Sequence, residues 1–254
     1  MPSVASLEEL HRAVAGFTTT DLGLVIEPAA LVAARRSLDN SGFLLLGEVH
    51  GVRENPLIIR ALMQALGLSG LALEWPEDLA PMTSAFLAGE MLVDHSLLWF
   101  GDGRITAGHL AMLRERAAAG PLNLTLFDGS IGAGWSWSQR DEAMTRRILA
   151  HPSARNGTLV AAGNAHTPTI RTSLGIPLGA CLARHRPGVA EIRIRYGGGR
   201  YYNNEPRRFR RVRLARRQPR MHHSDGALVL DLPAACEAVV PQRPSPWPDG
   251  PHLR

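Results

Sequence analysis

The chain has 254 residues, 45% of them hydrophobic and 20% charged, which is the composition of an ordinary globular protein. A chain of this length can bury a full core without disulfides or a structural metal. It contains no run of about 18 apolar residues, which excludes a membrane-spanning helix.

The N-terminal residues 1–23 do not resemble a secretory signal. Glu8 and Glu9 stand where a signal peptide carries positive charge, and no apolar core follows them. The two cysteines, Cys181 and Cys236, lack the spacing of metal ligands, which is typical of inert thiols in a reducing compartment. These features predict a cytoplasmic protein.

Short apolar runs alternate with helical patterns from residue 43 to residue 162. The runs predict strands at 43–46, 70–73, 122–127 and 158–162, and the intervening patterns predict helices at 55–66, 77–92, 106–119 and 138–150. The segment 93–105 fits neither pattern. Four such alternations are typical of parallel βαβ units, so the sequence predicts an α/β fold with three layers. Its central sheet should be mostly parallel, with helices on both faces.

Local signals support three of these helices. Pro56 stands at the first position of the helix at 55–66, and Gly67 follows its end. The helix at 106–119 is amphipathic and is followed by Gly120. Ser138 and Asp141 have the spacing of a capping box before the helix that ends at Ala150.

The C-terminal part has another pattern. Alternating apolar and charged residues predict an edge or half-exposed strand at 189–196, and 227–232 predicts a last apolar strand. Residues 241–254 contain five prolines and predict a disordered tail. We therefore expect one domain over residues 1–240, whose motif-bearing core is 42–183.

All 28 basic residues are arginines, and eight of them lie between Arg207 and Arg220 without an intervening acid. Removing these eight leaves 20 basic residues against 23 acidic ones, so the net charge of +5 is a local feature. Unpaired arginines can engage phosphates, but Phe209 is the one aromatic residue in this run, which gives little for bases to stack on. We expect a solvated edge, or a lid that presents arginines to an anionic substrate, rather than a nucleic-acid interface.

Polar side chains come directly after each of the four apolar strands. The first strand leads into Glu48 and His50, the second into Glu74 and Trp75, the third into Asp128, and the fourth into Asn164 and His166. The carboxyl ends of parallel strands meet at one edge of a sheet, where open α/β folds bind their ligands. The sequence therefore predicts a polar site at this edge.

Glu48 and His50 are two residues apart, so an extended backbone would point both side chains to one side. Such a pair fits a general base with its orienting carboxylate, and it equally fits half of a metal site. Glu74 is either paired within the site or caps the helix after Pro76. His166 is a second candidate base, acid or ligand.

Arg140 and Asp141 are expected in the first turn of their helix. The helix dipole favours an acid there and disfavours a cation, so Arg140 should reach a carboxylate of the site or of the substrate. His222 and His223 have no carboxylate in register and are expected to have no role.

Four short motifs resemble, in order and character, those of the erythromycin esterase/ChaN/TIKI superfamily. They are LLLGEVHG at 44–51, LALE at 71–74, QRDEAM at 139–144 and AGNAH at 162–166. The likeness covers roughly residues 42–183 and implies an EreA/ChaN-like fold with a hydrolase-like site. The residues it implies as catalytic are Glu48, His50, Glu74, Arg140, Asp141 and His166.

The branches of this superfamily imply different chemistry. In the esterases the histidine that matches His50 activates water, whereas in the TIKI-type peptidases such residues bind a divalent metal. A metal-dependent member would hold Mn²⁺, Zn²⁺ or Co²⁺ through Glu48, His50, Glu74 and His166. ChaN-type members bind haem, which an aromatic content of 6% and the missing lipoprotein signal disfavour here. The chain is also shorter than the antibiotic esterases, which disfavours a macrolide as its substrate.

The sequence therefore predicts a hydrolase that cleaves an ester, lactone or amide in a small molecule or peptide. Water would be activated by His50 with Glu48 or Glu74. The residues expected to contact substrate are Arg53, Trp75, Asp128 and Asn164. The alternative is a non-catalytic protein of the ChaN type that binds haem or a metal-containing ligand.

Overall fold

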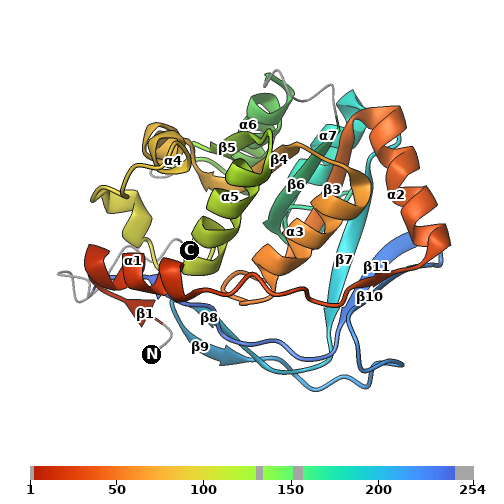
Figure 1. Cartoon of the computed structure of the whole chain (residues 1–254). Helices are drawn as coiled ribbons and strands as arrows, with labels where there is room; N and C mark the ends of the chain where they lie inside the picture. The colour runs from red at the N-terminus through yellow and green to blue at the C-terminus, as the bar shows by residue number, and fades with distance from the viewer. Residues whose placement is uncertain (1–2, 130–133, 151–156, 244–254) are drawn as a thin grey trace.

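The computed structural model describes residues 3–129, 134–150 and 157–243. Within these residues, eight strands form one sheet in the order β2-β10-β11-β7-β3-β6-β4-β5 (Figure 1). In that order they span Val25–Ile26, Arg220–Ser224, Ala227–Leu232, Ala190–Tyr196, Phe43–Glu48, Thr158–Gly163, Gly70–Pro76 and Asn123–Asp128. All neighbours are parallel except β10 and β11, so the predicted mostly parallel sheet is confirmed.

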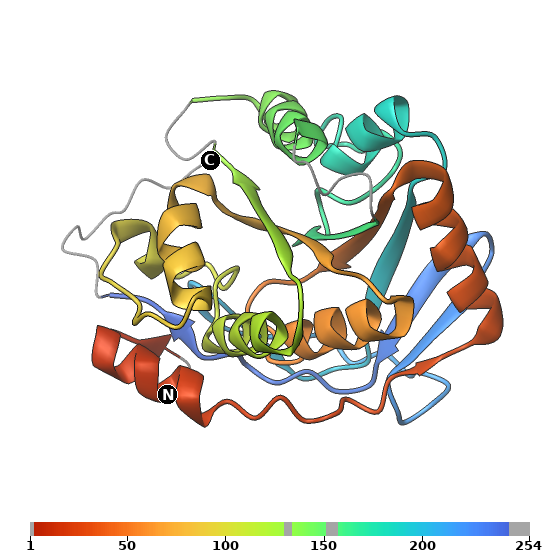
Figure 2. The ribbon, with the colours of Figure 1, turned by 45° about the horizontal axis from the view of Figure 1, so that its top comes forward.

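The central strands are buried on both faces because their successive side chains enter two separate cores. Leu44 and Leu46 of β3 pack with α3 (Asn55–Leu66) and α5 (Ala107–Ala119). Phe43 and Leu45 pack with α6 (Trp137–Ala150) and α7 (Leu178–His185). Figure 2 shows these helix pairs on opposite sides of the sheet, which confirms the three layers.

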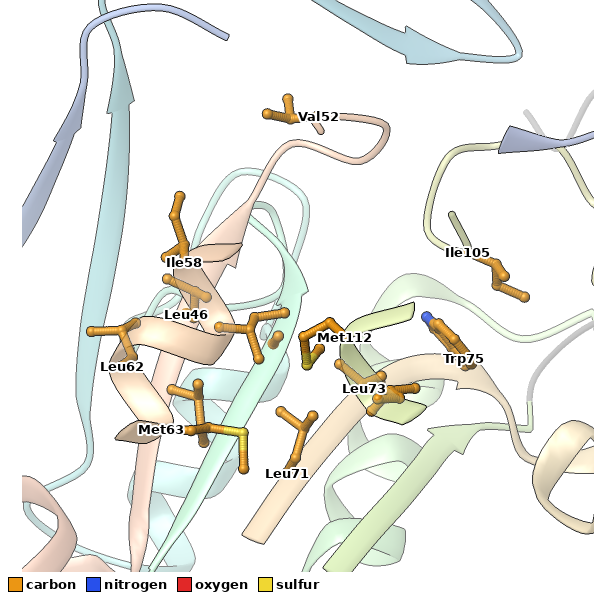
Figure 3. Close-up of a cluster of buried hydrophobic side chains, with 14 of the residues drawn as sticks. Leu46, Val52, Ile58, Leu62, Met63, Leu71, Leu73, Trp75, Ile105 and Met112 are labelled. Carbon is orange, nitrogen blue, oxygen red and sulfur yellow. The ribbon is translucent and has the colours of Figure 1, made fainter. Parts of the chain in front are cut away.

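The larger core lies under α3 and α5 (Figure 3). Leu46, Leu71 and Leu73 rise from the sheet to meet Ile58 and Met112 of the helices, and all of them are buried. These aliphatic contacts hold the strands and the covering helices in fixed positions, so the polar strand ends stand on a rigid frame.

The remaining elements surround this sheet. They are β1 (Ser3–Val4), α1 (Leu7–Gly16), α2 (Pro28–Ser41), η1 (Glu77–Leu79), α4 (Ala80–Leu87), η2 (Ser96–Trp99), β8 (Arg200–Asn203), β9 (Glu205–Arg208) and β12 (Val240–Pro241). Pro241 pairs with Val4 of β1, and the backbone N–H of Gln242 donates to the Val4 carbonyl at 2.9 Å. Residues 244–254 of the predicted tail lie outside the described residues. No described helix is long and apolar enough to cross a membrane.

Several local predictions are confirmed and two are wrong. α3 begins at Asn55 with Pro56 as its second residue, and Gly67 ends it in the left-handed conformation. The predicted helix at 77–92 is broken into η1 and α4 and ends at Leu87. The strand at 189–196 is half exposed as expected, but β7 is not an edge strand, since it lies between β11 and β3.

The second error concerns the start of α6. The helix begins at Trp137, and the reciprocal capping pair is Ser136 and Gln139, whose side chains each accept a hydrogen bond from the other's backbone N–H. The hydroxyl of Ser138 instead accepts from the backbone N–H of Ile176 at 3.0 Å. The predicted box of Ser138 and Asp141 is therefore wrong by two residues.

Candidate active site

Four parallel strands bring their polar ends to one edge of the sheet, as predicted. Glu48 and Gly163 are the last residues of β3 and β6 and stand opposite each other in register. Glu74 lies two residues before the end of β4, whose Pro76 pairs with Asp128 at the end of β5. The structure thus brings Glu48, Glu74 and Asp128 to the same edge, where His50 and His166 meet them.

Glu48 and His50 form the first carboxylate–imidazole pair. Glu48 Oε1 lies 3.2 Å from His50 Nδ1, so a proton on Nδ1 leaves Nε2 able to accept another. Glu48 is 5% exposed, and its Oε2 has no hydrogen-bond partner among the described residues. Burial lowers the pKa of His50, but the hydrogen bond to Glu48 and the charges of Glu74, Glu48 and Asp102 outweigh it and raise the pKa above 6.5.

Asp141 and His166 form the second pair. Asp141 Oδ1 lies 2.7 Å from His166 Nδ1, and Asp141 Oδ2 accepts from the backbone N–H of Leu178 at 2.8 Å. Trp137 stacks on the imidazole of His166 with ring centroids 4.2 Å apart and planes 6° apart. Asp141 is fully buried and is the fifth residue of α6, so its predicted place in the first turn is wrong. It holds His166 rather than the helix end.

Glu74 lies between the two histidines. Its Oε1 is 3.5 Å from His166 Nε2, and its Oε2 is 3.8 Å from His50 Nε2. Oε1 also accepts from Arg140 at 2.8 Å, and Oε2 accepts from the backbone N–H of Gly163 at 2.8 Å. The predicted alternative, a cap for the helix after Pro76, is wrong because Glu74 makes no such bond. Burial raises the pKa of Glu74, but His166, Arg104, His50 and Arg140 together hold it well below its usual value.

Two arginines keep this group of acids together. Asp128 Oδ2 accepts from Arg104 at 2.6 Å and from Arg140 at 2.8 Å, and Arg104 also binds Asp102 at 2.5 Å. Arg140 reaches site carboxylates as expected. Arg104 and Asp102 were not predicted, because they lie in the segment 93–105 that showed no pattern. The sequence feature that could have indicated them is their position as a charged pair on either side of Gly103, directly before the helix at 106–119.

Gly163 faces the middle of the site. A Cβ atom added there would lie 3.2 Å from His50 Nε2, 3.5 Å from Glu74 Oε2 and 3.6 Å from His166 Cδ2. The space in front of the Gly163 Cα is thus bordered by both imidazoles and by the carboxylate between them. A reacting atom in that space would be within reach of all three groups.

The four predicted substrate contacts lie in different environments. Trp75 and Asp128 are buried, and the indole N–H of Trp75 donates to the Arg104 carbonyl at 2.9 Å, so both support the site from within. Asn164 is exposed next to Glu48, whose carbonyl accepts from its backbone N–H at 2.8 Å. Arg53 is exposed and lies over the ring of Phe17.

The donor groups do not fit a divalent metal. Among the described residues, no three His, Cys, Asp or Glu side chains are arranged to hold a metal ion. Both oxygens of Glu74 already accept hydrogen bonds, and the guanidinium groups of Arg104 and Arg140 lie 3.7 Å and 2.8 Å from its Oε1. Two fixed cations beside the central ligand would repel a third.

A hollow near α6 is not lined by the candidate histidines, and three of the tryptophans differ in their contacts with the site. A hollow of about 420 Å³ is bordered by Trp135, Ile176, Cys181 and Arg184 among others, and neither His50 nor His166 lines it. Trp137 contacts His166, whereas the indole N–H of Trp99 donates to Asp94 at 2.6 Å. Among Trp99, Trp135 and Trp137, all of which the structure describes, Trp137 is the one that contacts a candidate catalytic residue.

The arginine-rich segment continues from β9 along the lower side of the molecule in Figure 1. Its arginines are not all unpaired, because Arg207 binds Glu205 at 2.8 Å and Arg220 binds Glu27 at 2.5 Å. Phe209 is stacked on Tyr196, with centroids 4.2 Å apart, so one face of its ring is already covered. The prediction that His222 has no carboxylate companion is wrong, because its Nε2 lies 3.5 Å from Asp231 Oδ2.

No protein-family model and no curated protein matches the chain. Among solved structures, a succinoglycan biosynthesis protein aligns with a TM-score of 0.57 and 10% identity, over 91% of this chain and 98% of that one. The type III effector HopBA1 aligns with a TM-score of 0.47 and 17% identity, over 81% of this chain and 94% of that one. The first likeness shows a shared fold and, at this identity, nothing about the reaction.

Proposed function

We propose that the chain is a hydrolase that cleaves an ester, lactone or amide bond in a small molecule or peptide without a metal. The observation that carries this proposal is the arrangement around Glu74. Two imidazoles, each oriented by its own carboxylate, face this buried acid across the space in front of Gly163.

In this proposal His50 is the general base. Its Nε2 takes a proton from water while the water oxygen attacks the carbonyl carbon, and Glu48 and Glu74 stabilise the imidazolium that forms. When the tetrahedral intermediate collapses, the bond to the alcohol or amine breaks and the imidazolium returns the proton to this leaving group. His166 is the second acid–base group, on the other side of Glu74.

Covalent catalysis by cysteine has little support. Cys181 is buried, and burial together with Glu142 raises its pKa to about 11, so little thiolate exists at neutral pH. Its sulfur lies 3.2 Å from Arg184 rather than near a histidine. Water is therefore the proposed nucleophile.

The resemblance to the erythromycin esterase/ChaN/TIKI superfamily supports the same reaction. The four matched motifs supply every residue of the two pairs, together with Glu74 and Arg140. Because the donor set does not fit a metal, we infer that the chain belongs with the esterase-like branch of that superfamily rather than its peptidase-like branch.

A panel of esters, lactones and peptides in ¹⁸O-labelled water tests the proposed reaction. We expect at least one substrate class to yield a carboxylic acid that carries one ¹⁸O atom, as detected by mass spectrometry. A panel in which the wild-type protein and its His50→Ala variant give equal, background release would contradict the proposal.

The rate should rise with pH through a pKa above 6.5, because His50 must be neutral to act as a base and its pKa is raised in the folded protein. Below that pKa, His50 is protonated and cannot accept a proton from water. We expect Glu48→Gln to move this limb to lower pH, since the variant removes a negative charge at 3.2 Å. The measurement is kcat/KM against pH. A wild-type midpoint below 6.5, or an unmoved limb in Glu48→Gln, would argue against His50 as the base.

Chelation should leave the activity unchanged. Arg104 and Arg140 occupy the place beside Glu74 where a metal would need to bind, so we expect no stoichiometric metal by elemental analysis, before or after EDTA. Glu48→Ala/His50→Ala protein is the matched sample. Stoichiometric Mn, Zn or Co that is lost in this double variant would contradict the metal-independent mechanism.

A further inference from the structure

The backbone of Val49 links the two members of the first pair, Glu48 and His50. Both of its polar groups are bound by side chains from other parts of the chain. The Val49 N–H donates to the hydroxyl of Tyr196 at 2.9 Å, and the Val49 carbonyl accepts from the Asn55 side-chain amide at 2.8 Å. Tyr196 ends β7, and Asn55 begins α3.

These two hydrogen bonds take the place of sheet hydrogen bonds just beyond the end of β3. The ladder between β3 and β7 ends at Gly47 and Arg193, and the ladder between β3 and β6 ends at Glu48 and Gly163. Val49 therefore lies just beyond both ladders. A backbone group that leaves a sheet inside the protein needs another partner, and here two side chains provide it.

Both residues are buried within the fold. Tyr196 is buried, and its ring stacks on Phe209 with planes 6° apart. Asn55 is fully buried, and its backbone N–H donates to the Val52 carbonyl at 3.2 Å. The position of the Val49 peptide is thus set by one residue of the sheet and one of the helix that covers it.

We infer that Tyr196 and Asn55 are positioning residues for the Glu48–His50 pair. By fixing the backbone N–H and carbonyl of Val49, they keep Glu48 Oε1 3.2 Å from His50 Nδ1. This contact places the proton of the neutral imidazole on Nδ1 and leaves Nε2 to face Glu74. The effect on rate rests on the proposed hydrolase function. The effect on the imidazole does not.

The test compares Tyr196→Phe with Tyr201→Phe. Tyr196→Phe keeps the ring on Phe209 and removes only the hydroxyl that binds Val49. Tyr201 packs on the same Phe209, with centroids 4.5 Å apart, and does not bind Val49, so Tyr201→Phe is the matched control. Asn55→Leu, which removes the other anchor and keeps the branched shape of the side chain, is the second variant.

The first readout is the ¹⁵N spectrum of the His50 ring, at a pH where the imidazole is neutral. We expect the wild-type protein and Tyr201→Phe to carry the proton on Nδ1. Tyr196→Phe and Asn55→Leu should shift the population toward the form protonated on Nε2, with His166 unchanged as the internal reference. A His50 spectrum identical to wild type in both variants would overturn the inference.

The second readout is steady-state kinetics on the best substrate of the hydrolysis panel. We expect kcat to fall roughly 10-fold to 100-fold in Tyr196→Phe with little change in KM, because the base is misplaced while the binding surface is intact. A shifted ¹⁵N spectrum with unchanged kcat would refute the role in the reaction. If no substrate is hydrolysed, the proposed function fails, and the ¹⁵N spectra still decide the positioning of His50.

Discussion

His50→Ala is expected to lower kcat by roughly 10²–10⁴-fold, the contribution of a positioned general base. In the Glu48–His50 pair, the imidazole is the group that takes the proton from water. The accepting nitrogen, Nε2, lies 3.8 Å from Glu74 Oε2. The His50 side chain lies at the sheet edge and belongs to neither hydrophobic cluster, so its loss leaves the apolar cores intact. The measurement is kcat at saturating substrate, with circular dichroism and thermal unfolding as the test of folding.

His223→Ala is the matched control for this variant. His223 is exposed on β10, so we expect its removal to change neither kcat nor stability. Near wild-type turnover by a folded His50→Ala protein would remove His50 from the mechanism. A comparable loss in His223→Ala would show that the assay responds to something other than the site.

Asp128→Asn is expected to lower the free energy of unfolding by about 3 kcal/mol, because it leaves two largely buried guanidinium groups, 11% and 22% exposed, without part of their compensating charge. Asp128 is 1% exposed and binds both Arg104 and Arg140. Arg104 keeps Asp102 and Glu74, and Arg140 keeps Glu74, so the loss should fall short of complete unfolding. Urea denaturation measures the change.

Glu8→Gln makes the same carboxylate-to-amide change in an exposed pair. Glu8 binds Arg12 at 2.7 Å with both side chains largely in water, and such pairs contribute about 0–1 kcal/mol. We expect a clear difference between the two variants. Equal, small changes would mean that Asp128 does not hold the two arginines in solution, and the account of the site as a charge-balanced unit would be wrong.

The candidate site could be predicted largely because each of its strands is a short apolar run that ends abruptly in a polar residue. Glu48, Glu74 and Asp128 each stand at the end of such a run, and the parallel order of the strands is enough to bring them together. The pairing of Glu48 with His50 is predicted by their spacing of two. These inferences depend on local sequence alone.

The features that the sequence did not predict depend on distant contacts or weak patterns. Arg104 lies in a loop without periodicity, and only the folded chain brings it to Asp128, 24 residues away. The helix α2 buries Ala30, Ala34, Ser37 and Ser41, small residues that leave almost no hydrophobic signal. The anchoring of Val49 by Tyr196 joins residues 147 positions apart and has no local signature.

Gly163→Ala tests the central claim most directly, because it adds one methyl group to the space between His50, Glu74 and His166. Gly163 does not adopt a positive φ, so the backbone accepts alanine, and the N–H that binds Glu74 is kept. Gly16→Ala, at the end of α1 with no atom within 4 Å of the added Cβ, is the control. We expect Gly163→Ala to fold but to lose roughly 10²-fold or more in kcat/KM, because the His50 ring must move away from the added Cβ at 3.2 Å, and Gly16→Ala to match wild type. Wild-type turnover by a folded Gly163→Ala protein would show that the reaction does not use this space, and would contradict the account.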